Sequence, residues 1–367
     1  MSPAGAPGPA LHVRGVLLPD DEVRDLWLVG DRVTYEPVAG AQTINEGGFV
    51  LPGLVDAHCH IGIAPSGRPI TGLDEARALA VPDREAGVLA IRDAGSPYPY
   101  PELDDEPGLP RLARAGRHIA PPKRYLRDIG VEVPASELRA AVAEQAAAGN
   151  GWVKLVGDWI DRDAGDLTPT WDEATLTDAV QAAHQAGVRA AVHTFSESAV
   201  DIMVRAGVDS VEHGTGLSVD LVDEMARRGT ALVPTMINID TFGGIAERAA
   251  ERFPGYAKHM LALRDGFPEV VRAAYEAGVP IFVGTDAGGG INHGLAAEEI
   301  LLLHERAGMS TLDVLAAGSW AARAWLGFPG LVEGGLADLV VYATDPRTDL
   351  RALRTPSRIV LRGQVVR

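Results

Sequence analysis

The residues best suited to chemistry are histidines, an aspartate and a lysine that lie in or at the end of short apolar runs. His58 and His60 close the run L-V-D-A-H-C-H, which begins at Leu54. Successive side chains of a β-strand point to opposite faces, so the two imidazoles share one face and Cys59 takes the other. Two neutral imidazoles directed at one point form half of a metal site. This spacing is weak alone, because two histidines can also end a strand without binding a metal.

Four further residues that could bind a metal lie in or at the end of other apolar runs. His193 and His213 end apolar runs, Asp286 ends V-P-I-F-V-G-T-D, and Lys154 lies inside W-V-K-L-V. Each has a structural alternative: a core histidine bonded to a carbonyl, an aspartate that caps a helix, or a lysine that extends its amine to solvent. Their joint placement favours one metal site, because the structural alternatives require unrelated coincidences at one rim.

Lys154 suggests the nature of that site. An ammonium among the apolar residues of W-V-K-L-V is costly, and burial lowers a lysine pKa toward the neutral amine. A neutral amine can add carbon dioxide to give a carbamate, a carboxylate-like group that can bridge two cations. The expected result is a two-metal site with a water that is deprotonated near neutral pH.

Apolar runs that alternate with helical segments predict the elements that position these residues. Strands are predicted at residues 51–58, 88–93, 152–157, 188–193, 208–213, 231–236 and 280–286, with a weaker third strand at 117–120. Helices are predicted at 136–148 and 172–186, and two more within 245–277, divided at Pro254-Gly255. Eight such units predict a (β/α)8 TIM-like barrel, whose chemistry lies at the C-terminal ends of the strands. A doubly wound open sheet is the alternative, but no G-x-G-x-x-G opens the first helix.

Both ends of the chain have the sequence pattern of short β-strands without helices between them. Short alternating strands, with a Gly30-Asp31 turn, predict that residues 1–50 and 335–367 pair into a small β-sandwich beside a catalytic barrel of residues 51–334. Residues 1–9 are predicted to be a disordered tip.

Composition excludes several classes of protein. The formal net charge of −17 disfavours nucleic acid and anionic membranes as partners, and no apolar run is long enough to span a membrane. The N-terminus does not resemble a signal peptide, and the single cysteine suits a reducing cytoplasm. A small-molecule substrate is therefore expected, and a homo-oligomer is possible.

These motifs together resemble the amidohydrolase superfamily of metal-dependent hydrolases. The resemblance rests on H-C-H after G-L-V-D-A, the strand lysine, the histidines that end two later strands, and G-T-D-A-G. The C-terminal stretches H-G-L-A-A-E-E-I-L-L-L-H-E-R-A-G-M-S and G-L-A-D-L-V-V-Y-A-T-D-P are similar to its imidazolonepropionase-like and Xaa-Pro-dipeptidase-like branch. The similarity extends from Phe49 to the end of the chain.

The resemblance implies a ligand set of two divalent metal ions, expected to be zinc. His58, His60 and Asp286 would hold one metal, His193 and His213 the second, and carboxylated Lys154 would bridge them. Arg92-Asp93, in A-I-R-D-A-G, would be structural.

Two departures fall where substrate would be recognised. After Lys154 this chain reads L-V-G-D-W rather than the Ser-Gly-Gly typical of dipeptidase-like members, and the segment 95–122 is short. The peptide specificity of that branch therefore does not transfer. The lysine also differs from imidazolonepropionases proper, which use one metal without it.

Four residues are weaker candidates for substrate contact. His293 follows a glycine-rich loop, Arg124 and Tyr125 lie in a loop above the barrel, and His118 lies in the weak third strand. A helix-entry role for His293 and a solvated cation for Arg124 are the alternatives. Cys59 is expected to pack against the helices. The remaining histidines, His12, His184, His259 and His304, are assigned to surface or structural roles.

The predicted activity is hydrolysis of an amide or other C–N bond in a small molecule, such as a dipeptide, an N-acyl amino acid or a cyclic amide. A metal-bound hydroxide would attack the carbonyl, with Asp286 and His213 in the catalytic group and Asp286 moving the proton to the leaving nitrogen. An esterase or lactonase would use the same site. A catalytically silent metal- or ligand-binding scaffold is a further alternative, which the intact ligand set argues against.

Overall fold

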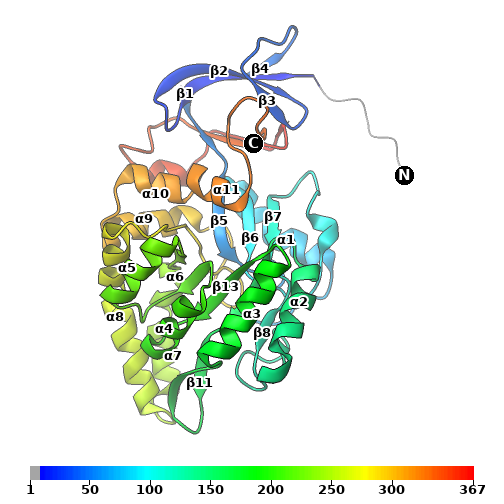
Figure 1. The fold of residues 1–367 in the computed structure, drawn as a ribbon. Helices are drawn as coiled ribbons and strands as arrows, with labels where there is room; N and C mark the ends of the chain where they lie inside the picture. Colours follow the sequence, from blue (N-terminus) through cyan, green and yellow to red (C-terminus); the bar gives the residue numbers. More distant parts are fainter. Residues whose placement is uncertain (1–8) are drawn as a thin grey trace.

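One mixed β-sheet joins the two ends of the chain. The computed structural model describes residues 9–367, so the predicted disordered tip lies outside the described residues except for residue 9 (Figure 1). The sheet contains β1 (Leu11–Leu17), β2 (Glu22–Val29), β3 (Arg32–Thr34), β4 (Gln42–Pro52), β16 (Leu339–Tyr342), β17 (Arg358–Leu361) and β18 (Gln364–Val365), in the order β18-β17-β16-β4-β1-β2-β3.

The pairing of the two ends is confirmed, because β16 runs antiparallel to β4. The turn at Gly30 has a φ of 58° and connects β2 to β3 as a hairpin, as its sequence predicts. The described strands belong to one continuous seven-stranded sheet rather than to the two sheets of the expected sandwich.

Parallel strands alternate with helices in the middle of the chain. One sheet contains β5 (Leu54–Cys59), β6 (Val88–Asp93) and β7 (Arg111–Arg114), and a second contains β8 (His118–Ala120), β9 (Val131–Glu132), β10 (Trp152–Val156), β13 (Arg189–Thr194), β14 (Ser210–His213) and β15 (Ala231–Val233). Both faces of β5, β6 and β10 are fully buried, as expected for parallel strands covered by helices.

The third and eighth strands differ from the prediction. The third is divided at Gly116, with a φ of 66°, into β7 and β8, so the prediction missed residues 111–114. The segment 280–286 is not a regular strand. Leu232 nevertheless donates to the carbonyl of Pro280, and Ala57 donates to that of Val283, so this segment lies between β15 and β5. Among the described residues, the parallel strands form two sheets, and closure into one eight-stranded sheet is not seen.

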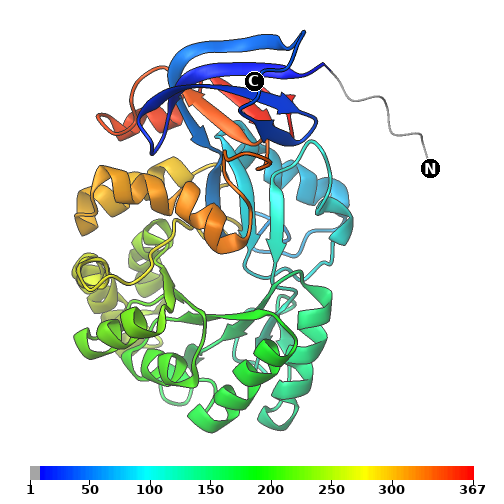
Figure 2. The same ribbon diagram turned by 45° about the horizontal axis from the view of Figure 1, so that its top comes forward.

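Helices surround these strands, and the seven-stranded sheet lies at one end of them (Figure 2). The helices are α1 (Leu73–Glu85), α2 (Leu138–Ala148), α3 (Glu173–Gln185), α4 (Glu197–Ala206), α5 (Val219–Arg228), α6 (Met236–Asp240), α7 (Phe242–Ala249), α8 (Pro254–Glu276), α9 (Ala296–Ala307), α10 (Thr311–Ala317) and α11 (Trp320–Leu326). The predicted division at Pro254 is confirmed, since this proline starts α8. Within the described chain, no helix is long and apolar enough to cross a membrane.

A short hairpin that the sequence did not predict follows β10. It consists of β11 (Asp158–Asp161) and β12 (Asp166–Pro169), which pair antiparallel. Figure 1 shows β11 at the end of the molecule opposite the seven-stranded sheet. The hairpin therefore lies at the C-terminal ends of the parallel strands, where the predicted site residues gather.

Candidate metal centre

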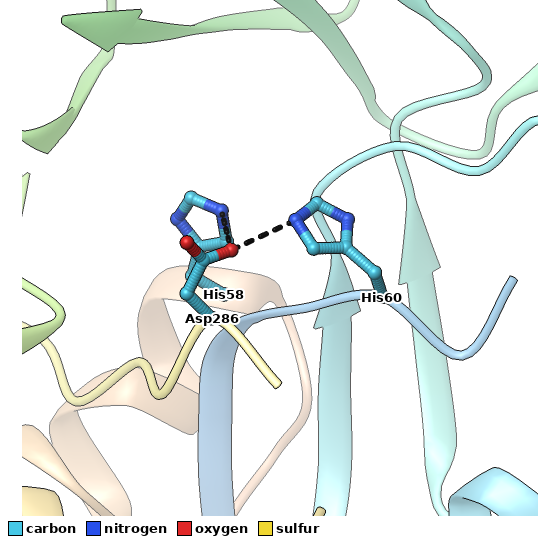
Figure 3. A group of neighbouring side chains, drawn as sticks. All are labelled: His58, His60 and Asp286. Carbon is cyan, nitrogen blue, oxygen red and sulfur yellow. Dashed lines mark hydrogen bonds and ion pairs between the residues drawn. The ribbon is translucent and has the colours of Figure 1, made fainter. Parts of the chain in front are cut away.

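The first-strand histidines meet the aspartate of the eighth segment. Nε2 of His60 and Nε2 of His58 lie 3.0 and 3.2 Å from the same oxygen, Oδ1 of Asp286 (Figure 3). The amide of Asp286 also donates to the carbonyl of His58 at 2.7 Å, which fixes the irregular segment against β5. Three ligand atoms this close, each from a metal-binding residue type, could hold one ion.

The other predicted ligands lie beside this group. Ring centroids of adjacent members are 4.8 to 5.9 Å apart around a closed circle of His58, His213, His193, Tyr125, His118 and His60. The structure thus brings residues from β5, β8, β13 and β14, the residue that follows β5 and one from the loop after β8 to one rim.

Lys154 lies on the inward face of β10. It pairs in register with His118 of β8 and Ala191 of β13, and laterally paired residues of a parallel sheet share a face. Its Nζ atom is buried without a hydrogen-bond partner among the described residues. Burial lowers the pKa of Lys154 to about 8, which makes the neutral amine accessible near physiological pH.

Buried polar atoms without hydrogen-bond partners among the described residues indicate whether a metal group fits this site. Nε2 of His193 is also buried and unpartnered within the described chain. An unpaired buried polar atom costs free energy, so two such atoms at one rim indicate groups prepared for a ligand. Burial lowers the pKa of His193 to about 3, which favours the neutral imidazole that binds metals. The residue set fits a binuclear centre with a carboxylated lysine.

Two neighbours orient the histidines. Nδ1 of His58 lies 2.7 Å from Oε2 of Glu212, and Nδ1 of His213 lies 2.7 Å from Oγ1 of Thr235. Such contacts at one ring nitrogen fix the orientation of the other toward a metal. Sequence reasoning missed both residues, although Glu212 gives a signal as a carboxylate inside the apolar run S-V-E-H.

Glu212 is held as an anion by Arg92. Nη2 of Arg92 donates to both carboxylate oxygens at 2.7 Å, and its Nε donates to the carbonyl of Ala57. Burial alone would raise the pKa of Glu212, but the Arg92 guanidinium and other nearby cations hold it well below its usual range. These contacts agree with the structural role predicted for Arg92.

Two of the four predicted substrate residues lie outside the circle. Nδ1 of His293 donates to Oδ2 of Asp83 in α1 at 2.8 Å, on the side of β5 that carries Cys59. Cys59 is fully buried there, facing away from His58 and His60. Arg124 bonds to the β11–β12 hairpin instead of pointing at the histidines.

The four histidines assigned to other roles each contact a nearby acceptor. His12 contacts Asp25, His184 contacts Asp209, His259 contacts Asp166 and Glu197, and His304 contacts the carbonyl of Met309.

Three residues near the circle were missed by sequence reasoning. The ring of Phe195 lies 4.4 Å from that of His193, and the ring of Trp159 lies 5.5 Å from it. Oδ1 of Asp158 is buried, has no hydrogen-bond partner in the part of the chain that the structure describes, and lies 3.9 Å from Nε2 of His193. The signal was present in L-V-G-D-W, directly after the lysine strand, but the hairpin that positions these side chains was not foreseen.

The fold and the rim of histidines are typical of a class of α/β enzyme in which polar groups at strand ends surround a metal site, and three of them here could hold an ion. The chain belongs to the amidohydrolase family, whose model matches residues 123–366. Members of this family generally use divalent metal ions and act on small molecules. The protein is therefore a hydrolase that acts on C–N bonds.

Two further similarities extend over nearly the whole chain. A Mycobacterium tuberculosis protein is 51% identical over 355 residues, which cover 96% of this chain and 95% of that protein. The structure of a putative prolidase from Bifidobacterium longum superposes with a TM-score of 0.83 at 24% identity, covering 98% of this chain and 95% of the prolidase. This neighbour has the fold that the predicted dipeptidase-like branch implies.

Ochratoxinase from Aspergillus niger is similar in both sequence and structure. It is 25% identical over 234 residues, which cover 61% of this chain and 47% of ochratoxinase. Its crystal structure superposes with a TM-score of 0.79 at 18% identity, covering 97% of this chain and 95% of the other.

Proposed function

We propose that the protein is a binuclear metal-dependent hydrolase that cleaves an amide or related C–N bond of a dipeptide, an N-acyl amino acid or a cyclic amide. The observation that carries the proposal is the buried amine of Lys154 beside the histidine circle, which has no hydrogen-bond partner in residues 9–367. A lysine left as a plain ammonium there would be destabilising, whereas its carbamate would be satisfied by two cations.

The ligands divide between two ions, with zinc expected at both. His58, His60 and Asp286 would hold the first, His193 and His213 the second, and carboxylated Lys154 would bridge them. When bound, the ions would polarise the scissile carbonyl and lower the pKa of a water molecule.

Asp286 is the residue proposed to move the proton. Its Oδ1 atom lies against His58 and His60, which leaves Oδ2 for the reacting water. Burial alone would raise the pKa of Asp286, but the adjacent histidines hold it well below its usual range, so the carboxyl is ionised near neutral pH. The same carboxyl would then donate to the leaving nitrogen.

Metal stoichiometry tests the proposal. The wild-type chain, grown with excess metal and bicarbonate, is expected to hold two ions and to hydrolyse members of a small amide panel. Lys154→Ala should lose metal and activity, with partial rescue by a small carboxylate such as propionate. Lys258→Ala, at an exposed lysine of α8, is the matched control and should behave as wild type.

Two outcomes would contradict the proposal. One ion per wild-type chain under these conditions would eliminate the binuclear centre. Hydrolysis of lactones or esters without hydrolysis of any amide would assign the site to C–O bonds instead.

A further inference from the structure

The β11–β12 hairpin places an aromatic wall beside the histidine circle. The Trp159 ring lies 4.8 Å from that of Tyr125 and 5.5 Å from that of His193. The buried ring of Phe195 lies 4.4 Å from that of His193 and 4.9 Å from that of His213. Trp159 and Tyr125 keep part of their surface exposed, so their rings are not simply core residues.

The first residue of the hairpin is rigidly held. Oδ2 of Asp158 accepts from the amides of Phe195 and Ser196 at 2.8 and 2.6 Å, at the start of α4. On the returning side, Oγ1 of Thr170 and Nε1 of Trp171 both donate to the carbonyl of Val156. These bonds fix the direction in which the next residue, Trp159, leaves β10.

Arg124 closes the hairpin at the level of Trp159. Its Nη2 atom donates to the carbonyls of Trp159 and Thr168 at 3.1 and 3.0 Å and to Oγ1 of Thr168 at 2.8 Å. Trp159 and Thr168 are register partners in the two strands. Since Tyr125 directly follows Arg124, the same guanidinium aligns both aromatic rings.

This use of Arg124 changes what the site can recognise. The sequence nominated its guanidinium to bind a substrate carboxylate, but Nη2 is committed to three acceptors of the hairpin, and Nη1 lies 3.4 Å from Asp161. Arg92 is likewise engaged, because its Nη2 atom donates to both oxygens of Glu212. The faces presented there are aromatic, and aromatic rings favour stacking with a flat apolar group.

We propose that Trp159, Tyr125 and Phe195 select amide substrates that carry an uncharged aryl group, and that Arg124 is a positioning residue for this wall. The inference rests on the proposed function, and it narrows the substrate class of the same site. It also gives the L-V-G-D-W departure a role, because this sequence supplies the hairpin and its tryptophan.

Matched substrates test the preference. The metal-loaded wild-type chain is assayed on pairs of small amides that differ only in an aryl or a methyl group, with and without a free carboxylate. The aryl member should have kcat/KM at least about tenfold higher, and the carboxylate should give no advantage. Trp159→Ala should remove the aryl preference mainly through KM, whereas Trp159→Phe should keep most of it.

Binding supplies a readout that does not depend on turnover. Titration of the full-length chain with benzamide should quench tryptophan fluorescence. Trp159→Phe should abolish most of the quenching, while Trp27→Phe, in the seven-stranded sheet, should retain it. Thermal melting of each variant establishes that it is folded. Trp159→Phe is the variant to use if Trp159→Ala does not fold.

Arg124→Met separates positioning from direct contact. If Arg124 is a positioning residue, the variant should show a smaller preference for aryl amides. Its ratio of kcat/KM for amides with and without a free carboxylate should be unchanged. Selective loss of activity on carboxylate-bearing amides would instead show that Arg124 binds substrate, and would overturn the inference.

Equal wild-type kcat/KM for aryl and methyl amides, with hydrolysis of both, would overturn the inference while leaving the proposed function intact. Absence of all amide hydrolysis would overturn the proposed function, and quenching by benzamide would still decide whether the wall binds an aryl group.

Discussion

At the scale of single residues, the site is distinguished by backbone conformations that side chains rarely adopt. His213, Thr235 and Asp286 have φ angles of 67°, 53° and 57°, although none is glycine. This left-handed region is costly for such residues and persists where surrounding contacts enforce it. At all three positions the strand or segment ends at the rim, so the strain turns side chains toward one another.

The proposed proton shuttle gives the first prediction at this scale. Asp286→Asn keeps the size of the side chain and one oxygen that can ligate, but removes the group that accepts a proton. General acid–base catalysis contributes roughly 10²–10⁴-fold, so kcat should fall by at least that much while a large part of the metal is retained. Both quantities are measured on the same preparation.

Asp172→Asn is the matched control. Asp172 accepts from the amide of Thr175 as a helix cap, and asparagine caps about as well as aspartate. Turnover of Asp286→Asn within a few-fold of wild type, like that expected for Asp172→Asn, would eliminate Asp286 as the shuttle.

At the scale of elements, His259 of α8 connects the hairpin to α4. Its Nδ1 atom lies 2.8 Å from Oδ1 of Asp166 in β12, and its Nε2 atom lies 3.0 Å from Oε2 of Glu197. Burial alone would lower the pKa of His259, but the two carboxylates raise it above its ordinary value of 6.5. An imidazolium can donate to both carboxylates at once, whereas a neutral ring can donate to only one.

The hairpin should therefore loosen as pH rises. Because the folded-state pKa is raised, the stabilisation is complete below pH 6.5 and is lost as pH increases through the folded-state value. Limited proteolysis between β11 and β12, followed from pH 5.5 to 8.5, should show faster cleavage at the upper end. His259→Phe should remove this pH dependence, and an unchanged profile in the variant would refute the connection.

At the scale of the whole molecule, Asp338 links the parallel strands to the seven-stranded sheet. Its Oδ2 atom accepts from Nε of Arg111 in β7 at 2.6 Å and from Nη2 of Arg323 in α11 at 2.7 Å. Asp338 is fully buried and precedes β16. Burial alone would raise the pKa of Asp338, but Arg323 and Arg111 lower it, so this link should weaken only as pH falls below 3.8.

Removal of this carboxylate should destabilise the whole chain. Asp338→Ala leaves two buried guanidinium groups without their partner, and breaking a buried pair in this way costs about 3–5 kcal/mol of unfolding free energy. Glu298→Ala, which removes a surface pair with Arg354, should cost no more than about 1 kcal/mol. Urea unfolding measures both, and equal effects would show that the link contributes little.

Much of this organisation is readable from the sequence, because hydrophobic periodicity and glycine punctuation are local signals. They predicted most of the parallel strands, the division of α7 from α8, and the pairing of the two chain ends. The residue types His, Lys and Asp, in or at the end of apolar runs, also indicated which strand ends carry polar groups. The expected metal identity, cytoplasmic location and oligomeric state remain predictions.

Only the tertiary structure decided which of these side chains meet. The sequence placed Arg124 and His293 with the substrate, but long-range contacts commit Arg124 to the hairpin and pair His293 with Asp83 behind β5. Sequence reasoning also missed Glu212 and Trp159, because nothing in the neighbouring sequence shows that Glu212 contacts His58 or that Trp159 contacts Tyr125. Residue type and spacing determine what chemistry a strand end can offer, whereas the packing of distant segments determines which partner each group has.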